Sequence, residues 1–255
     1  MSLLEIVDLK KYFGDTHAVD DVSLGINEGE FVSLVGANGA GKTTLINLIS
    51  AFFPPDSGQI WFKGRDITQL SATERVEAGI ARSFQLVNLF DERSVFDNVA
   101  QAIFSRDGKT LQFLVLAEHD DAVTEETMGV LRLFSLDAKR DVLAGQLAQG
   151  ERKLLDVAVA YALRPSLLCL DEPTSGVSTR DKAQIMDTIS SVIRDHSITA
   201  VIVEHDMDVV FKYSNRIVVM NQGAILADGT PEEIRNNDEV ATVLLGTPSA
   251  NRITA

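Results

Sequence analysis

Short apolar segments alternate along this chain with segments that have helical periodicity. The apolar runs that read as strands share a richness in Leu, Ile, Val, Phe and Trp; they lie at residues 4–9, 18–26, 30–35, 58–63, 166–170, 198–203 and 216–220. Helical spacing follows three of them, at residues 42–51, 179–195 and 206–213. Because strands that alternate with helices form parallel sheets, the pattern predicts an α/β fold built on a parallel sheet.

The middle of the chain interrupts this alternation. Residues 95–104 and 124–135 have the apolar spacing of helices, and the stretch 105–121 between them is ambiguous. Ser71 and Glu74 form the sequence pattern of a capping box, which predicts the start of a further helix. We therefore expect one domain over residues 1–255, in which 86–160 form a helical lobe and 1–85 with 161–255 form the core.

A glycine-rich segment follows the apolar strand that ends at Val35. It reads Gly36, Ala37, Asn38, Gly39, Ala40, Gly41, Lys42, Thr43, Thr44, and it matches the phosphate-binding pattern G-x-x-x-x-G-K-[ST]. Glycines let the backbone curl so that several N–H groups point at phosphate oxygens, and the helix that follows adds its positive N-terminal end. The pattern predicts that Lys42 reaches the outer phosphates and that the Thr43 hydroxyl binds Mg²⁺.

Two carboxylates stand at the end of a second apolar strand. Asp171 and Glu172 directly follow the run Leu167–Leu170. Carboxylates at the C-terminal end of a central strand lie where a parallel sheet binds its ligands. We expect Asp171 to hold Mg²⁺ through water, and Glu172 to act as the general base on the attacking water. Read in isolation, the pair is also compatible with a solvated strand end.

These motifs and four further positions resemble the ATP-binding subunit of ABC transporters over nearly the whole chain. In order, the matching residues are Phe13, the phosphate loop, Gln85, the signature segment Leu147 to Glu151, Asp171 with Glu172, and His205. The resemblance implies a P-loop NTPase core with an antiparallel β subdomain and an inserted helical lobe. It also implies that Phe13 stacks on adenine, that Gln85 touches Mg²⁺ and links the lobe to a membrane subunit, and that His205 contacts the γ-phosphate of ATP.

The signature segment departs from the commonest form of that family at one position. Ala148 stands where most members have serine, and the segment continues with Gln149, Gly150 and Glu151. The resemblance implies that this segment is lent across a dimer to the ATP bound by a second ATP-binding subunit. Loss of one hydroxyl donor to a charged group costs roughly 1.5–3 kcal/mol, so we expect this composite site to be weakened and not abolished. Ser178, where many members carry aspartate, is a second departure.

Composition and charge narrow the partners. The 255 residues are 45% hydrophobic and carry a formal net charge of −14, which argues against sequence-independent binding of nucleic acid. The single cysteine, Cys169, excludes an intramolecular disulfide and fits a strand core. The N-terminus lacks the pattern of a signal peptide, and no apolar run approaches the roughly 20 residues that cross a bilayer. A membrane role would therefore go through a partner, and the resemblance implies that this partner is a set of permease subunits at the cytoplasmic face of the inner membrane.

Several stretches resemble the branched-chain amino-acid importer subgroup in particular. They are Arg82–Gln85 with Asn88–Phe90, Val203–Met207, Gly229–Asn237 and Leu244–Gly246. Such importers resemble assemblies of two ATPases, two membrane subunits and a substrate-capturing protein, and alanine at the signature serine also occurs in them. Related ATPases that serve urea, amides or lipopolysaccharide export remain alternatives. An ABC ATPase that acts on DNA or ribosomes fits less well because this chain has no long coiled-coil insertion or second ATPase domain, and a small-molecule kinase would not need the signature segment or His205.

Overall fold

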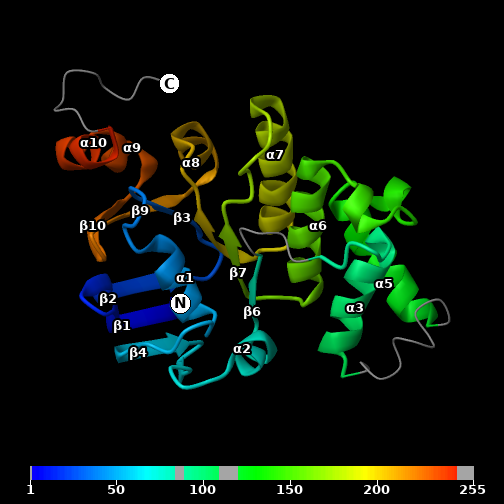
Figure 1. Cartoon of the computed structure of the whole chain (residues 1–255), viewed down its shortest axis with the longest axis horizontal. Helices are drawn as coiled ribbons and strands as arrows, with labels where there is room; N and C mark the ends of the chain where they lie inside the picture. Colours follow the sequence, from blue (N-terminus) through cyan, green and yellow to red (C-terminus); the bar gives the residue numbers. More distant parts are fainter. Residues whose placement is uncertain (1, 84–88, 109–119, 246–255) are drawn as a thin grey trace. The chain divides into compact units, whose positions relative to one another are not determined.

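The computed structural model describes residues 2–83, 89–108 and 120–245 of the chain (Figure 1). The fold divides into two compact units: Met1–Arg75 with Ser197–Ala255, and Val76–His196. The division falls inside helix α2 (Ala72–Ala78). Each unit is therefore described by itself.

An antiparallel sheet forms one half of the first unit. Its four strands follow the order β2-β1-β4-β5 and are β1 (Ser2–Phe13), β2 (Thr16–Asn27), β4 (Ser57–Phe62) and β5 (Arg65–Asp66). From Asp21 to Asn27 the residues of β2 alternate between exposed and buried, as expected for a strand with one face against a core. This sheet is the antiparallel subdomain that the family resemblance implies.

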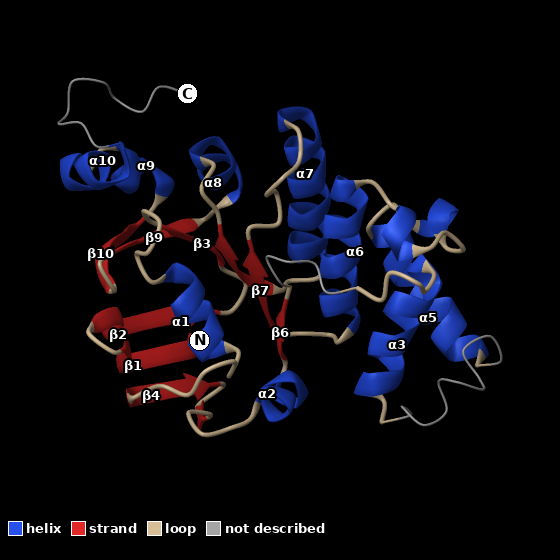
Figure 2. Cartoon of the chain, in the orientation of Figure 1, coloured by secondary structure: helices blue, strands red, loops and turns tan. Residues whose placement is uncertain are grey.

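Parallel strands form the other half of the first unit. β3 (Phe31–Val35) pairs in parallel with β8 (Thr199–Val203) and β9 (Arg216–Asn221), and β10 (Ala224–Gly229) pairs antiparallel with β9. Every residue of β3 and β8 is buried, which explains their uninterrupted apolar sequence. The helices of this unit, shown in blue in Figure 2, include α1 (Lys42–Ile49), α8 (Met207–Tyr213), α9 (Pro231–Arg235) and α10 (Asp238–Leu245).

The second unit combines two parallel strands with a group of helices. β6 (Ile80–Arg82) pairs with β7 (Leu167–Asp171). The α-helices are α3 (Val95–Arg106), α5 (Asp121–Leu133), α6 (Gln149–Ala162) and α7 (Thr179–Asp195), with short 3₁₀ turns η2 (Asp137–Lys139) and η3 (Ala144–Gln146). Helix α6 packs against α3, α5 and α7, and it is therefore the central helix of this unit.

The long predicted elements are confirmed, with small changes at their ends. Helix α1 stops at Ile49, two residues before the end of the predicted range 42–51, and α5 begins at Asp121, three residues before the predicted range 124–135. The capping box predicted at the start of α2 is formed, because Glu74 accepts from the N–H of Ser71 and donates its own N–H to the Ser71 hydroxyl. The lobe boundaries at residues 86 and 160 stay a prediction. No helix within the described ranges is long and apolar enough to cross a membrane.

Candidate functional site

The glycine-rich loop between β3 and α1 has a backbone that only glycine permits at two positions. Gly36 has φ 152° and Gly41 has φ 104°. A Cβ added to Gly36 would lie 2.3 Å from the main-chain oxygen of Met220, and one added to Gly41 would lie 2.2 Å from that of Ala18. Because both obstacles are backbone atoms, a side chain would force the loop to open. The spacing of glycines in the sequence therefore has a direct steric cause.

The side chain of Lys42 folds back onto the start of this loop. The residue is only 5% exposed, and its Nζ donates to the main-chain oxygens of Gly36, at 2.8 Å, and Ala37, at 3.0 Å. In the rest of the loop Ala37, Asn38 and Gly39 are exposed, whereas Ala40 is buried. No side chain caps the N-terminus of α1, which begins at Lys42. The helix end, its N–H groups and the ammonium group of Lys42 together favour an anion.

Two further predicted site residues lie in the same unit. Phe13 is 46% exposed and meets the ring of Phe53 edge-on, with 5.5 Å between ring centroids. An exposed aromatic ring is accessible for stacking on a planar ligand, and a side chain exposed to this extent is not a core residue. His205 is exposed just after β8, and its N–H donates to Oε2 of Glu204.

Asp171 ends β7 in the second unit and has two unequal carboxylate oxygens. Its Oδ2 accepts a hydrogen bond from Nη2 of Arg82 at 2.9 Å, while Oδ1 is buried and finds no hydrogen-bond partner in the described part of the chain. Buried polar atoms of native proteins normally have a hydrogen-bond partner or a bound ligand, so a ligand at this oxygen would supply the missing interaction. A carboxylate oxygen is a ligand type that Mg²⁺ prefers. Asp171 therefore fits the predicted role in holding the metal.

The other predicted metal ligands are placed less completely. Thr43 is exposed in the first turn of α1, so its hydroxyl is accessible. Gln85 lies outside the described residues. Within those residues no cluster of three His, Cys, Asp or Glu side chains could hold a metal. Such a sparse set suits Mg²⁺, which is commonly bound through one or two protein oxygens together with substrate phosphates and water.

Glu172 has an unusual backbone conformation. It has φ 49°, in the left-handed region that residues other than glycine rarely adopt. Its main-chain oxygen accepts a hydrogen bond from Nζ of Lys153, a residue of α6 that is only 3% exposed.

Two residues before Asp171, Cys169 is buried in β7, and this burial raises the pKa of its thiol to about 12. The thiol therefore stays protonated, which agrees with the predicted core role of this cysteine.

The signature segment begins helix α6. Leu147 is buried, whereas Ala148 and Gln149 are exposed. The carboxylate of Glu151 accepts from the N–H of Ala148 at 3.1 Å, but Ala148 has no side-chain oxygen to return the bond, so half of a capping box is formed. A Cβ added to Gly150 would lie 3.3 Å from Cδ1 of Ile185 on α7, so this glycine also allows close packing of α6 on α7.

Ser178 has a structural role at the start of α7. Its hydroxyl accepts from the N–H of Asp181 and donates to Oδ2 of the same residue, at 3.3 and 2.7 Å. Serine is a favoured N-cap residue, so this departure from the family pattern preserves the helix start.

Sequence reasoning missed two other residues, the buried cations Arg82 and Lys153. The available signal was a charged residue at the end of a short apolar strand for Arg82, and a charged residue on the buried face of α6 for Lys153.

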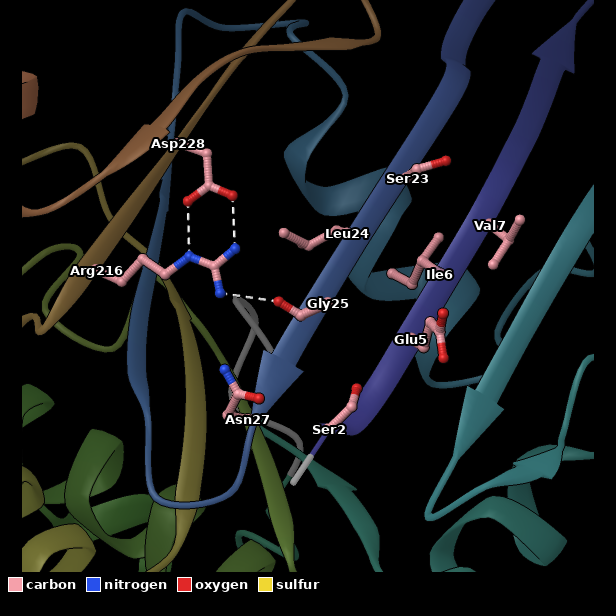
Figure 3. Close-up of a pocket in the computed structure, with 10 residues that line it drawn as sticks. All are labelled: Ser2, Glu5, Ile6, Val7, Ser23, Leu24, Gly25, Asn27, Arg216 and Asp228. Atoms are coloured by element: carbon pink, nitrogen blue, oxygen red, sulfur yellow. Dashed lines mark hydrogen bonds and ion pairs between the residues drawn. The ribbon is translucent and has the colours of Figure 1, made fainter.

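A separate pocket lies in the first unit beside β1 and β2 (Figure 3), with a volume of about 590 Å³. Its most conspicuous side chain, Arg216, makes two 2.6 Å hydrogen bonds to the carboxylate of Asp228 and one to the main-chain oxygen of Gly25. The charge of Arg216 is thus already balanced. None of the residues predicted for nucleotide binding lines this pocket.

Comparison with known proteins agrees with this geometry. The family model described as ABC transporter matches residues 19–175. The high-affinity branched-chain amino acid transport ATP-binding protein LivG of Salmonella typhimurium is 37% identical over 253 residues, which cover 96% of this chain and 98% of LivG. The corresponding protein BraF of Pseudomonas aeruginosa is 35% identical over 251 residues, with the same coverage of 96% and 98%.

Solved structures show the same fold. An ATP-binding cassette of an ABC transporter in its ADP conformation has a TM-score of 0.85 and 29% identity, covering 97% of this chain and 100% of that chain. A nucleotide-free cassette has a TM-score of 0.81 and 29% identity, covering 97% and 96%. The predicted fold class, with a P-loop core, a parallel sheet and an antiparallel sheet, is confirmed.

Proposed function

The chain belongs to the ABC transporter family, as an ATP-binding and ATP-hydrolysing subunit, and we propose that it powers the uptake of branched-chain amino acids. The observation that carries the ATPase function is the loop from Gly36 to Gly41, closed around Nζ of Lys42. Support for the transported substrate comes from relatives such as LivG and BraF, whose names state branched-chain amino acid transport and which match this chain almost from end to end.

The phosphate loop binds the polyphosphate of ATP. Its backbone N–H groups and the N-terminus of α1 contact the phosphate oxygens, and Lys42 balances the charge of the outer phosphates. Phe13 stacks its exposed ring on adenine, and His205 contacts the γ-phosphate.

Glu172 acts as general base. Its carboxylate accepts a proton from the attacking water, so that the oxygen gains nucleophilic character as it approaches the γ-phosphorus. The left-handed backbone at Glu172 sets the direction in which this side chain leaves the strand. Such a conformation persists only where surrounding contacts hold it, and the hydrogen bond from Lys153 is one of those contacts.

Thr43, Asp171 and Gln85 are the residues that would hold Mg²⁺. When bound, the metal neutralises charge on the β- and γ-phosphate oxygens. The Thr43 hydroxyl and the unpartnered Oδ1 of Asp171 supply hard oxygen ligands.

A second ATP-binding subunit completes the catalytic assembly. The exposed residues Ala148 and Gln149, with the N-terminus of α6, are presented to the ATP that this second subunit binds. A cavity of about 200 Å³ lined by Ala148, Gly150 and Glu151 with residues of α7 lies beside this end of α6.

Membrane-spanning permease subunits hold the ATPase at the cytoplasmic face of the membrane, and a substrate-binding protein acts through them. The contact includes Phe90, whose side chain is 54% exposed although its main chain is held by the buried Asn98. An apolar side chain exposed to this extent favours a partner contact over a place in the core of this unit. The contact that we propose also includes Leu86 and Val87, which lie outside the described residues.

Reconstitution tests both parts of the proposal. The chain is purified with the membrane subunits that accompany it from gently solubilised membranes, and leucine uptake into proteoliposomes is measured with internal ATP. We expect ATP-dependent leucine uptake, and we expect Glu172→Gln to bind ATP while losing both hydrolysis and uptake. Lys42→Ala should lose ATP affinity in calorimetry with the fold retained.

The outcomes separate the alternatives. Uptake of urea or an amide in place of leucine would retain the ATPase function and overturn the substrate. Copurification with ribosomes and no membrane subunit would overturn transport itself. Near wild-type hydrolysis by Glu172→Gln in the assembled complex would show that Glu172 is not the base.

A further inference from the structure

Arg82 and Asp171 form a buried ion pair on neighbouring strands. The side chains are 8% and 0% exposed, and Nη2 of Arg82 lies 2.9 Å from Oδ2 of Asp171. The parallel pairing of β6 with β7 sets Arg82 opposite Cys169, and the N–H of Ser83 extends this pairing to the oxygen of Cys169. The main chain on both sides of the ion pair is thus held by the sheet.

This arrangement constrains the carboxylate more than a surface pair would. A carboxylate removed from water needs hydrogen-bond partners inside the protein, and Arg82 supplies a charged donor to Oδ2 of Asp171. The hydrogen bond also goes to one oxygen only. Because Oδ2 is engaged by Arg82, rotation of the carboxylate is restricted, and Oδ1 is left as the oxygen without a partner in the part of the chain that the structure describes.

We propose that Arg82 is a positioning residue for Mg²⁺ binding: it holds Oδ2 of Asp171 so that Oδ1 faces the metal. The proposal rests on the ATPase function proposed above, and it adds a residue to the site that touches neither ATP nor the metal. Groups that orient a metal ligand in this way typically change metal affinity by about 10- to 100-fold when they are removed. Arg82 would therefore matter for ATP bound with Mg²⁺ and not for ATP bound without it.

Calorimetry on the full chain tests this distinction. MgATP is titrated into the protein, and ATP is titrated separately in the presence of EDTA. For Arg82→Met we expect the MgATP affinity to fall about 10- to 100-fold while the affinity for metal-free ATP stays within about twofold of wild type. Arg82→Lys should recover most of the loss, because lysine keeps a charged donor, although it lacks the planar fork of arginine.

A matched control removes another arginine from an ion pair of the same unit. Arg106 pairs with Glu126, and Arg106→Met should lower stability without a selective loss of MgATP affinity. If Arg82→Met does not fold, the test rests on Arg82→Lys. Equal losses of affinity for MgATP and for metal-free ATP in that variant would overturn the proposal. Unchanged MgATP affinity in a folded Arg82→Met protein would also overturn it. A wild-type chain that binds no ATP in either titration would instead contradict the proposed function.

Discussion

Lys153 on α6 donates a hydrogen bond from Nζ to the main-chain oxygen of Glu172, with 3.2 Å between the two atoms. Lys153 lies three residues after Gly150, on the helix whose start carries the signature segment. The hydrogen bond therefore ties α6, whose N-terminus we propose is presented to the second subunit's ATP, to the backbone of the proposed base. We expect this contact to help hold Glu172 in its working position.

Replacing Lys153 by methionine tests this link. A hydrogen bond from a charged donor contributes roughly 1.5–3 kcal/mol, so we expect Lys153→Met to lower kcat about tenfold or more. The KM for ATP should change little, because the contact that this variant removes goes to the backbone of the proposed base. Lys153→Arg should restore most of kcat. Steady-state kinetics of the assembled transporter give both constants.

Arg152 provides the matched control for that experiment. It is the preceding cation on α6, and its side chain pairs with Asp91 and with the main-chain oxygen of Ala144. Arg152→Met should leave kcat within about twofold. If Lys153→Arg fails to restore turnover, or if both methionine variants lose kcat equally, the link between Lys153 and Glu172 has no catalytic role.

We expect alanine to destabilise the protein to different degrees at two glycines of the phosphate loop. Gly41→Ala would bring a Cβ to 2.2 Å from the main-chain oxygen of Ala18, while a Cβ at Gly39, where φ is +80°, meets nothing within 4 Å. Gly39→Ala thus suffers only the left-handed backbone penalty of roughly 1–2 kcal/mol. We expect Gly41→Ala to reduce the free energy of unfolding by at least about 1–2 kcal/mol more than Gly39→Ala. Urea denaturation measures the difference, and equal losses would show that the contact with Ala18 does not constrain the loop.

The ion pairs of Glu126 lead us to expect that the stability of the second unit depends on pH. It accepts hydrogen bonds from Nη1 and Nη2 of Arg106, at 2.6 and 2.9 Å, and from Nε of Arg164. The hydrogen bonds from Arg106 are the main cause that holds the pKa of Glu126 below its ordinary value of 4.5. A carboxylate whose pKa is lowered by folding stabilises the protein above the unfolded pKa, and this contribution is lost as pH falls through the folded value.

Glu126→Gln should therefore lower the free energy of unfolding by roughly 1–3 kcal/mol at pH 7. The difference from wild type should shrink as the pH falls below 4.5. Urea denaturation at several pH values measures it, with Glu125→Gln as the control, because Glu125 is an exposed neighbour on the same helix. A difference that stays constant down to acid pH would mean that the ion pair is not its source.

The sequence indicated the long elements because their apolar pattern is strong and continuous. β3 and β7 are buried along their whole length, so their apolar runs stand out. β6 has three residues and β5 has two, too few for a period to show. Helix α9 was missed although Thr230, Pro231 and Glu233 form a capping box with proline in the first turn, a signal that could have predicted it.

The candidate site was predictable where a motif carries the chemistry within a few residues, as from Gly36 to Thr44. Arg82 and Lys153 were not predictable in the same way. Their roles depend on partners 89 and 19 residues away in the chain. Only folding brings a buried cation to Asp171 or to the backbone of Glu172, and no local pattern encodes that contact.

If the second ATP-binding subunit differs from this chain, we expect Ala148 to make the two composite ATP sites chemically unequal. The structure shows that alanine here removes two things: a hydroxyl that could donate to phosphate, and an oxygen that would accept from the helix and complete the capping box with Glu151. We expect loss of the donor to weaken closure on the second subunit's ATP by roughly 1.5–3 kcal/mol, about 10- to 150-fold. We expect the N-terminus of α6 and the backbone near Gly150 to supply the remaining interactions with phosphate.

Ala148→Ser should restore both interactions, and Ala148→Asp separates them. Aspartate caps a helix about as well as serine, so both variants should raise the stability of the chain by roughly 0.5–2 kcal/mol. Only serine adds a donor, because the aspartate carboxylate is repelled by phosphate. Hydrolysis at each site is measured in the assembled complex while the other site is silenced by a glutamate-to-glutamine change. We expect Ala148→Ser to speed the second subunit's site, Ala148→Asp to slow it, and this chain's own site to stay nearly unchanged in both.

If the two variants shift hydrolysis in the same direction, capping of α6 is the cause and not the donor. Equal rates at both sites before substitution, with no response to serine, would contradict the asymmetry and show that alanine is simply tolerated at this position.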